Sequence, residues 1–225
     1  ISMLEMKRGR LLEKADSRGH DSPIDESVSQ RSWEAGLSQS QKKAFNFYLS
    51  AAYDSDFPRA VQRADAAGAV GGTDIEVTAR ELRSAMGSAT KITTDVYRGM
   101  ALSSDALLKV GAEFKQPTFA SWSRTRQIAS GYAASNSGNI RAVFHIKTDV
   151  VDVGRLGPYS QVQKEVLVDK GLYARVTRVR ESLSNRGFFY VELEQSKRLS
   201  QHAISRPLAY ADAKGHLYAE WYESK

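Results

Sequence analysis

The 225-residue chain contains no cysteine, and this absence excludes several kinds of chemistry. A thiol nucleophile, a disulfide framework and a zinc site built from thiolates all require cysteine. Histidine is scarce as well, and the four histidines are too scattered to form the closely spaced pair of a helical metal site. We therefore expect no bound metal.

Long hydrophobic runs are also missing. No apolar stretch approaches the roughly 18 residues that span a bilayer, so we expect no membrane insertion. The first residues lack the apolar segment of a secretory signal and do not begin with methionine, which indicates a chain cut from a longer protein. Hydrophobic residues at 41% and charged residues at 26% are typical of a globular protein, and the length favours one domain with extensions.

Helical patterns come first along the chain. Residues 1–32 are polar and can bury little surface, so we assign them to a linker or a loosely attached arm. Residues 38–52 begin with a capping-box pair and continue with apolar residues at helical spacing, which predicts an amphipathic helix. A second capping pair predicts another helix over residues 73–86.

A β-rich body follows these helices. Short stretches rich in β-branched and aromatic residues, separated by glycine or proline, predict strands. They are residues 94–98, 118–123, 140–147, 164–168, 172–179 and 188–193, with short helices near 104–110 and 124–134. This order indicates an α+β fold with its main domain at residues 33–198. The aromatic tail, residues 199–225, forms either one more hairpin or a docking segment packed on the same domain.

Two short motifs on predicted strands are suited to binding. Arg98 ends a predicted strand, and Gly99 directly after it would let the backbone turn and a ligand approach closely. The planar fork of donors on an arginine is suited to holding a diphosphate. Ser121 and Ser123 alternate with Trp122, so both serines point to the same side of their strand.

A third motif contains the candidate catalytic carboxylate. A loop that begins at Pro158 runs into a strand, where alternation would place Gln163 and Glu165 on one face and Lys164 on the other. Tyr159 lies on the same loop. Its side chain would either contact a target or pack on its own strand.

Arginine in Y-R-G, then S-x-S after an aromatic residue, then Q-x-E before an apolar strand is similar to the arginine-serine-glutamate class of mono-ADP-ribosyltransferases. This class includes bacterial exotoxins and vertebrate ectoenzymes, and the resemblance covers residues 37–194. It implies N-terminal helices packed on a split, mixed or antiparallel β-sheet, and NAD+ as the co-substrate.

The resemblance implies a role for each motif residue that binds the co-substrate. Arg98, with Gly99 beside it, would hold the phosphates of NAD+. Ser121 would support the nicotinamide ribose and the catalytic glutamate, and Ser123 completes this part of the site.

The resemblance also implies the catalytic residues. Glu165 would hydrogen-bond the ribose 2′-hydroxyl, where a carboxylate stabilises the charge of an oxocarbenium-like transition state more than it stabilises the neutral ground state. Gln163 stands where related enzymes often have a second glutamate that aids the nucleophile, and Tyr159 would contact the target. The chain also departs from the family by having Trp122 where threonine is common, which implies different packing behind the site.

Taken singly, each motif residue has an ordinary structural explanation. Arg98 would serve as an ion-pair partner, the two serines as plain strand residues, and Glu165 as a solvent-facing charge. Their combination in this order favours the catalytic interpretation.

The acceptor of the ADP-ribose is less determined. A neutral amide at Gln163 cannot act as a general base, which disfavours an arginine acceptor. The resemblance to family members with Q-x-E implies instead an amide side chain of a GTPase-like protein or a nucleic acid as the acceptor. The net charge of +6 and isoelectric point near 9.4 favour RNA or DNA, although a solvated, charged sheet edge explains the charge equally well. The basic residues concerned are Arg124, Arg126, Arg175, Arg178, Arg180, Arg186, Lys197 and Arg198.

Three further possibilities stay open alongside nucleic acid. The acceptor can be a protein side chain, or it can be water, which would make the chain an NAD+ glycohydrolase. The third possibility is a catalytically silent binding module. From the resemblance we expect a monomeric bacterial toxin or effector that is secreted or delivered into a target cell, acts in its cytoplasm, and has an immunity protein in the producing cell.

Overall fold

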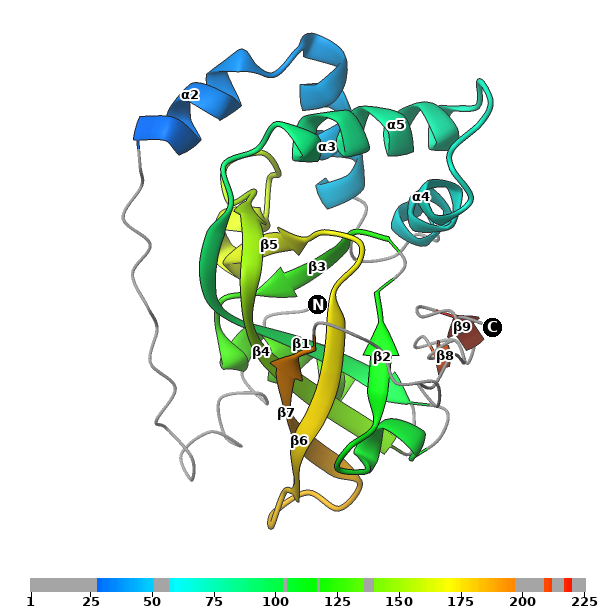
Figure 1. Ribbon diagram of the computed structural model, residues 1–225, viewed down its shortest axis with the longest axis vertical. Coiled ribbons are helices and arrows are strands. Elements are labelled where there is room, and N and C mark those ends of the chain that lie inside the picture. Colours follow the sequence, from blue (N-terminus) through cyan, green and yellow to red (C-terminus); the bar gives the residue numbers. More distant parts are fainter. Residues whose placement is uncertain are drawn as a thin grey trace.

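Figure 1 shows the computed structural model of the protein, in which residues 28–50, 57–102, 105–116, 118–135 and 140–196 are described, together with the short strands 209–211 and 217–219. Residues 1–27, most of the predicted tail, and Lys197 and Arg198 just before it lie outside the described residues. The predicted α+β class is confirmed, because helices are followed by a mixed sheet. None of the described helices combines the length and the apolarity that a membrane span requires.

The N-terminal helices gather at one end of the sheet (Figure 1). They are α2 (Val28–Gly36), α3 (Gln39–Ser50), α4 (Phe57–Ala66) and α5 (Asp74–Gly87). α2 begins inside the stretch that composition assigns to a polar arm. The buried side chain of Gln30 donates a hydrogen bond to the Asp152 carbonyl oxygen at 2.9 Å, so an arm can only precede Val28.

Both predicted capping boxes are present. The Ser38 hydroxyl accepts from the Gln41 amide at 3.1 Å, and the Gln41 side chain accepts from the Ser38 amide at 2.9 Å. Thr73 and Glu76 cap α5 in the same reciprocal way. These side chains satisfy backbone amides that the first helical turn leaves without partners, which is why α3 and α5 begin where they do.

Helix α4 is missing from the sequence-based prediction, although Phe57, Val61 and Ala64 form a short apolar stripe at helical spacing. Its fully buried positions are Val61 and Asp65, so one of the two is charged. Asp65 is buried because it is fully partnered. Arg83 on α5 donates to Asp65 through Nε at 2.8 Å and again through Nη2, and the Thr118 hydroxyl donates to it at 2.7 Å. Arg83 also contacts Asp169, and we call these four residues the Asp65 cluster.

The described strands other than those of the tail form one seven-stranded sheet in the order β1-β3-β5-β4-β7-β6-β2. They are β1 (Ile92–Leu102), β2 (Glu113–Lys115), β3 (Ala120–Ser123), β4 (Ile140–Asp152), β5 (Glu165–Val168), β6 (Tyr173–Glu181) and β7 (Phe188–Gln195). The six predicted strands are confirmed, with β1 and β4 longer than expected, whereas the three-residue β2 is missed.

The pairing of the strands is mixed, as predicted. β4 and β7 are parallel, and the other pairs within this sheet are antiparallel. Because β4 pairs with both β1 and β5 while β3 bridges β1 and β5, these four strands close on one another. The closure places β3 and β5 beneath the N-terminal helices, whereas β7, β6 and β2 extend away from them (Figure 1).

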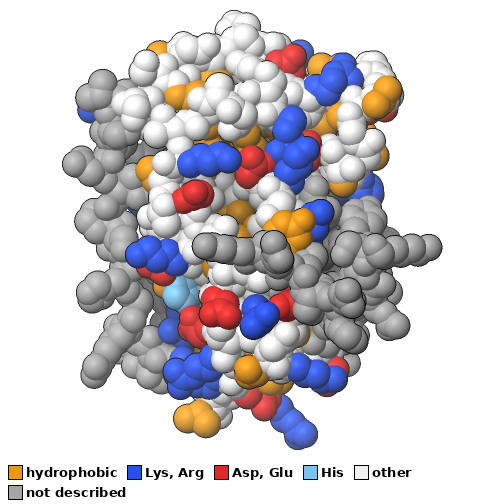
Figure 2. All heavy atoms as spheres, in the orientation of Figure 1, with side chains coloured by type: hydrophobic (Ala, Val, Ile, Leu, Met, Phe, Trp, Pro, Cys, Tyr) orange, Lys and Arg blue, Asp and Glu red, His pale blue; other side chains and the backbone are white. Residues whose placement is uncertain are grey.

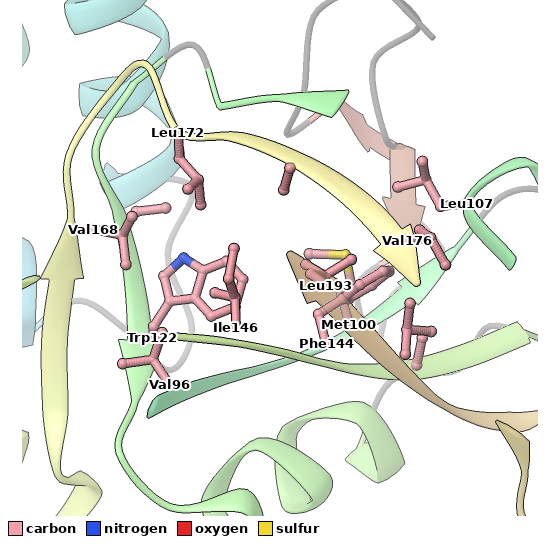
Figure 3. Close-up of a cluster of buried hydrophobic side chains, with 14 of the residues drawn as sticks. Val96, Met100, Leu107, Trp122, Phe144, Ile146, Val168, Leu172, Val176 and Leu193 are labelled. Atoms are coloured by element: carbon pink, nitrogen blue, oxygen red, sulfur yellow. The ribbon is translucent and has the colours of Figure 1, made fainter. Parts of the chain in front are cut away.

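Two main hydrophobic clusters lie on opposite sides of β3 and β5. The first gathers Trp122, Phe144 and Val176 with other side chains of the sheet (Figure 3). The second joins α3, α4 and α5 to Phe119 and Leu167. Alternation along β3 therefore sends Trp122 into one cluster while its neighbouring serines face the other side, as the sequence predicts.

Helix α6 (Arg126–Ser135) covers the other face of β1. A Cβ atom at Gly99 would lie 1.8 Å from the Ala129 carbonyl oxygen, so only glycine permits this contact between strand and helix. The backbone does not turn at Gly99, because β1 continues to Leu102. The expected turn is therefore wrong, and the packing of α6 accounts for the glycine.

The remaining short elements are η2 (Ala106–Leu108), a 3-10 turn within the helix predicted near 104–110, and α7 (Ser160–Gln163). In the tail, β8 (Ala209–Ala211) pairs antiparallel with β9 (Leu217–Ala219), which is the hairpin option of the prediction. The other residues of the tail lie outside the described part of the chain.

Candidate active site

The three motifs meet because their strands are neighbours. β3 pairs with both β1 and β5, and the register places Ser123 opposite Tyr97 on one side and opposite Glu165 on the other. Arg98, Ser121 and Glu165 thus stand on three adjacent strands. Motifs that are separated by more than twenty residues in the sequence form one cluster in the fold.

Glu165 is the buried carboxylate of this cluster, at 5% exposure. The Ser160 hydroxyl donates to its Oε2 at 2.8 Å, and the Ser121 hydroxyl on the neighbouring strand is near enough to favour its charged form. Burial raises the pKa of Glu165, while these two hydroxyls act in the opposite direction. Within the described part of the chain, the carboxylate is paired with hydroxyls and with no cation.

Two residues of this cluster are missed by the sequence motifs. Ser160 lies five residues before Glu165, at the start of α7, and is completely buried. Tyr48 on α3 is predicted only as part of an apolar helix face, yet its phenol accepts from Gln62 Nε2 at 2.8 Å and lies beside Ser121. The signal for Tyr48 is its chemistry, because a buried phenol needs a hydrogen-bond partner and leucine at the same position would not.

Arg98 is anchored beside the serine motif. Its Nη1 donates to the Ser121 carbonyl oxygen at 3.0 Å, and its side chain is half-buried. The guanidinium therefore has a fixed position next to the strand that carries Ser121. This geometry agrees with an anion-binding arginine, whose remaining donors extend in a planar fork.

Ser123 has a different set of partners from Ser121. Its hydroxyl donates to the Gln163 carbonyl oxygen at 2.8 Å and accepts from the Thr125 amide at 3.1 Å. These bonds hold the turn that leads into β5. Ser123 therefore fixes the position of Gln163 and Glu165 through the backbone.

Gln163 and Glu165 are brought together by a turn and not by strand alternation as predicted. Gln163 ends α7, Lys164 adopts the left-handed conformation with φ of 51°, and Glu165 begins β5. As a result both Gln163 and Glu165 are buried while Lys164 is exposed. The expected grouping of the side chains is correct, but its structural cause is the left-handed residue.

Two buried donors beside this turn have no hydrogen-bond partner among the described residues. They are Gln163 Nε2 and Arg124 Nε. Arg124 lies against the same turn, because its amide donates to the Lys164 carbonyl oxygen at 2.9 Å. Buried donors without partners are rare in proteins, and a bound molecule with oxygen acceptors would satisfy them.

The residues before Glu165 present an exposed face. Tyr159 is 51% exposed and Val162 is 68% exposed, so Tyr159 extends into solvent, and the contact with a target remains open to it. Arg155 and Lys164 are exposed on the same segment, and residues 153–164 contain no aspartate or glutamate. This segment is therefore apolar and basic.

The arginines of β6 are placed differently. β6 is separated from β5 by β4 and β7, so Arg175, Arg178 and Arg180 do not border Glu165. Arg175 is paired with Glu113 at 2.6 Å, and Arg180 lies over the Tyr190 ring. On the face shown in Figure 2, Lys and Arg side chains are interspersed with Asp and Glu. The expected basic surface near the site is thus limited to the residues around the turn.

A second polar cluster surrounds His145 on β4. Its ring is stacked on Tyr97, its Nε2 lies 2.9 Å from Asp95, and its Nδ1 contacts Glu192. Burial lowers the pKa of His145, but the hydrogen bonds to Glu192 and Asp95 outweigh this effect and raise it. Among the described residues, no group of three His, Asp or Glu side chains is arranged to hold a metal ion.

Comparisons with known proteins identify the fold. No protein-family model matches the chain, and no curated protein sequence matches it. Solved structures do match. The Vis toxin from Vibrio splendidus superposes with a TM-score of 0.56 and 15% identity over 90% of each chain. HopU1 of Pseudomonas syringae gives 0.57 and 16%, covering 74% of this chain and 80% of its own.

Exoenzyme S from Pseudomonas aeruginosa, solved with human 14-3-3 protein beta and carba-NAD, also matches. Its TM-score is 0.53 with 16% identity, over 80% of this chain and 89% of the exoenzyme. Vis and HopU1 are described as ADP-ribosyltransferases. The chain therefore has the ADP-ribosyltransferase fold, as its three motifs predict.

Proposed function

We propose that this protein is a mono-ADP-ribosyltransferase that cleaves the nicotinamide glycosidic bond of NAD+ and transfers ADP-ribose to a macromolecule. The environment of Glu165 is the observation that supports this proposal most strongly. Glu165 is a buried carboxylate that accepts a hydrogen bond from the Ser160 hydroxyl, lies near the Ser121 hydroxyl and is paired with no cation of the described residues. A structural carboxylate in such a position would normally be paired with a cation, whereas a catalytic one must keep its charge available.

Each motif residue has a task that its contacts support. Glu165 would stabilise the positive charge that develops at the ribose, and Ser121 and Ser160 orient its carboxylate. Arg98 would hold the phosphates from its anchored position on the Ser121 carbonyl oxygen. Gly99 would contribute only through the packing of α6, and Ser123 through the turn at Gln163.

NAD+ fits this arrangement and supplies the ADP-ribosyl group and the bond that breaks. The two buried donors without partners, Gln163 Nε2 and Arg124 Nε, lie beside the carboxylate and would find acceptors in a bound dinucleotide or in the acceptor. No residue of the proposed site requires a metal, because the guanidinium and the carboxylate already provide both signs of charge.

For the acceptor we favour a nucleic acid, RNA or DNA. The segment before Glu165 combines an exposed aromatic ring, Tyr159, with the exposed cation Lys164 and with Arg155, whose Nη1 lies 3.9 Å from Glu34 Oε2 on α2. It has no carboxylate of its own between residues 153 and 164. An aromatic platform flanked by cations suits a base and its phosphates. The Gln163 amide can position such an acceptor but cannot take its proton, so the acceptor must be a competent nucleophile without a general base at this position.

A toxin or effector role is proposed from the same comparisons, because Vis is described as a toxin. Delivery into the cytoplasm of a target cell and an immunity protein in the producing cell would follow from that role. A protein side chain and water remain the competing acceptors, and the experiment below separates them.

The test incubates the purified chain with NAD+ labelled in its adenylate part and with a bacterial lysate. The products are then digested separately with nuclease and with protease. We expect label in material that nuclease releases, and we expect its incorporation to fall steeply with salt, because each phosphate contact releases a counterion. Glu165→Ala is the loss-of-function variant, and Glu194→Gln, an exposed carboxylate on β7, is the matched control.

Each other outcome contradicts a defined part of the proposal. Label released only by protease would identify a protein acceptor. Free ADP-ribose without transfer would identify a glycohydrolase. Absence of nicotinamide release, or release that Glu165→Ala leaves unchanged, would overturn the proposed activity itself.

A further inference from the structure

The turn that leads into Glu165 has an inner and an outer face. Gly157 is half-buried, Ser160 is completely buried and Gln163 is 7% exposed, whereas residues 158, 159, 161 and 162 are exposed. A spacing of three residues suits the helical turn α7, which begins at Ser160 and ends at Gln163. We call Gly157, Ser160 and Gln163 the inner face of the turn.

Gly157 on the inner face lies directly against helix α3. A Cβ atom at this position would be 2.5 Å from Leu49 Cβ on α3 and 2.6 Å from Ser160 Oγ. Carbon atoms that are not bonded pack at about 3.5–4.0 Å, so an added methyl group does not fit between these neighbours. The φ of Gly157 lies outside the left-handed region, so its backbone conformation alone would accept alanine. Glycine is therefore required here for space.

This space is what the Ser160 side chain needs to reach the catalytic carboxylate, because its hydroxyl donates to Glu165 Oε2 at 2.8 Å. Leu49 cannot yield to a methyl group at Gly157, since its Cβ is attached directly to the helix backbone and its side chain is 1% exposed. Either the Ser160 side chain would rotate to another staggered position, or the start of the turn would move away from α3. Both movements take the hydroxyl away from Glu165.

The end of the turn is held independently of its start. The Ser123 hydroxyl donates to the Gln163 carbonyl oxygen at 2.8 Å, and the Arg124 amide donates to the Lys164 carbonyl oxygen at 2.9 Å. These bonds tie the residues just before Glu165 to the end of β3. A change at the start of the turn should therefore displace the hydroxyl donor more than the backbone of the carboxylate.

We propose that Gly157 is a positioning residue for Glu165, because it leaves the room between Leu49 and Ser160 through which the Ser160 hydroxyl reaches the carboxylate. The proposal rests on the proposed cleavage of NAD+. It assigns α3 a part in the reaction, since the turn rests on Leu49 of this helix. Gly157 itself touches neither NAD+ nor the carboxylate and acts through Ser160.

The test measures nicotinamide release from NAD+ as a function of pH for Gly157→Ala and Ser160→Ala side by side. Both variants should lower kcat about fivefold on the acidic limb, with little change at alkaline pH and an unchanged KM for NAD+. The limb should move to higher pH in both, because Glu165 loses a donor that favours its charged form.

The acidic limb reports on Glu165 and not on the other titratable side chains of the site. Burial raises the pKa of the Tyr48 phenol on α3 far above its ordinary value, so this group keeps its proton throughout the test. Arg98 on β1 carries a guanidinium, which stays charged in proteins. A shift of the limb therefore reflects the environment of the carboxylate.

A double-mutant cycle tests whether Gly157 acts through Ser160. In the Ser160→Ala background, Gly157→Ala should cause little additional loss of kcat. Gly36→Ala is the matched control, because a Cβ atom at this last residue of α2 would meet no atom within 4 Å, and its kinetics should equal those of the wild type.

A second variant approaches the same contact from α3. Leu49→Ala removes most of the side chain on which the turn rests and introduces no clash, so the limb should shift in the same direction by a smaller amount. Thermal unfolding of every variant identifies a temperature at which it is folded, and the kinetics are compared at that temperature. If Gly157→Ala does not fold at any assay temperature, Leu49→Ala decides the question.

The outcomes separate this inference from the proposed function. If the wild-type chain releases no nicotinamide, the proposed function fails. If the wild-type chain is active, an unshifted acidic limb in the folded variants, or a full additional loss in the Ser160→Ala background, would overturn the positioning role alone. A rise in KM in place of the fall in kcat would also overturn it, because it would indicate an effect on NAD+ binding.

Discussion

Asp65 and Glu165 are both buried carboxylates, 7% and 5% exposed, but the groups around them differ. Asp65 receives two hydrogen bonds from the Arg83 guanidinium and one from Thr118. Glu165 accepts a hydrogen bond from the Ser160 hydroxyl and lies near the Ser121 hydroxyl. The first carboxylate is neutralised by a cation within the fold, and the second keeps a charge that the described residues do not neutralise.

This difference shows what each carboxylate can contribute. A buried charge paired with a guanidinium stabilises the contact between helices and sheet as long as both partners remain. A buried charge held by hydroxyls alone is costly to the fold but is ready to stabilise a positive charge on a substrate. If Glu165 has its proposed role, the molecule separates structural from catalytic use of the same chemical group.

The largest effect should follow from neutralising the catalytic carboxylate. Glu165→Gln should reduce kcat for NAD+ cleavage by about a thousandfold, or about 4 kcal/mol of transition-state stabilisation. The same variant should be more stable than wild type by about 1 kcal/mol near pH 7, because the folded-state pKa of Glu165 is raised and its ionisation therefore opposes folding. Urea unfolding and a nicotinamide-release assay measure the two changes. A variant that is both inactive and less stable would contradict the comparison.

Removing the cation from the Asp65 cluster should destabilise the fold, whereas Glu165→Gln should stabilise it. Arg83→Leu should lower the free energy of unfolding by about 3 kcal/mol, because it leaves Asp65 buried without a cation. Asp65→Asn combined with Arg83→Leu should cost less than the sum of the two single changes. Urea unfolding of the three variants tests this coupling, and additive losses would mean that the pair does not act as a unit.

A smaller effect should follow from removing one hydroxyl donor at the catalytic carboxylate. Ser160→Ala should move the acidic limb of the kcat profile to higher pH, since the donor that favours the charged form of Glu165 is lost. On that limb we expect kcat to fall about fivefold, with little change at alkaline pH. Ser184→Ala, at an exposed serine, is the control. An unshifted limb would show that Ser160 does not influence Glu165.

The smallest effect should come from the half-exposed cluster at His145. Because the folded-state pKa of His145 is raised, its stabilisation is fully present below pH 6.5 and is lost as the pH rises through the folded-state pKa. Solvent screening limits this contribution to less than about 1 kcal/mol. His145→Gln should remove this part of the pH dependence in urea unfolding measured across the same range. An unchanged pH dependence would contradict the proposed charge state.

Much of the fold follows from local sequence signals. The capping boxes at Ser38 and Thr73 predict α3 and α5 because they satisfy backbone amides within a few residues. Alternation along residues 120–123 predicts that Trp122 and the serines face opposite sides, and the structure agrees. Helix α4 is not predicted, although Phe57, Val61 and Ala64 form a short stripe at helical spacing. The burial of Asp65 on this helix could not be predicted locally, because it depends on Arg83, far away in the sequence.

The site is predicted less completely than the fold, because part of it also depends on contacts between residues far apart in the sequence. The positions of Arg98, Ser121 and Glu165 on neighbouring strands follow from motifs with a set order. Tyr48 and Ser160 carry no motif, and only the tertiary packing brings them to the carboxylate. The grouping of Gln163 with Glu165 is predicted correctly from a wrong cause, since a left-handed residue and not strand alternation produces it.

The left-handed conformation of Lys164 has a consequence for how this sequence can change over time. The side chain is exposed, so chemistry alone would allow almost any replacement there. The backbone φ of 51° favours glycine and asparagine and disfavours β-branched residues. A mutational scan should therefore find Lys164→Gly and Lys164→Asn tolerated and Lys164→Val and Lys164→Ile rejected. Descendants of this chain would then vary little at a solvent-facing position, for a conformational reason.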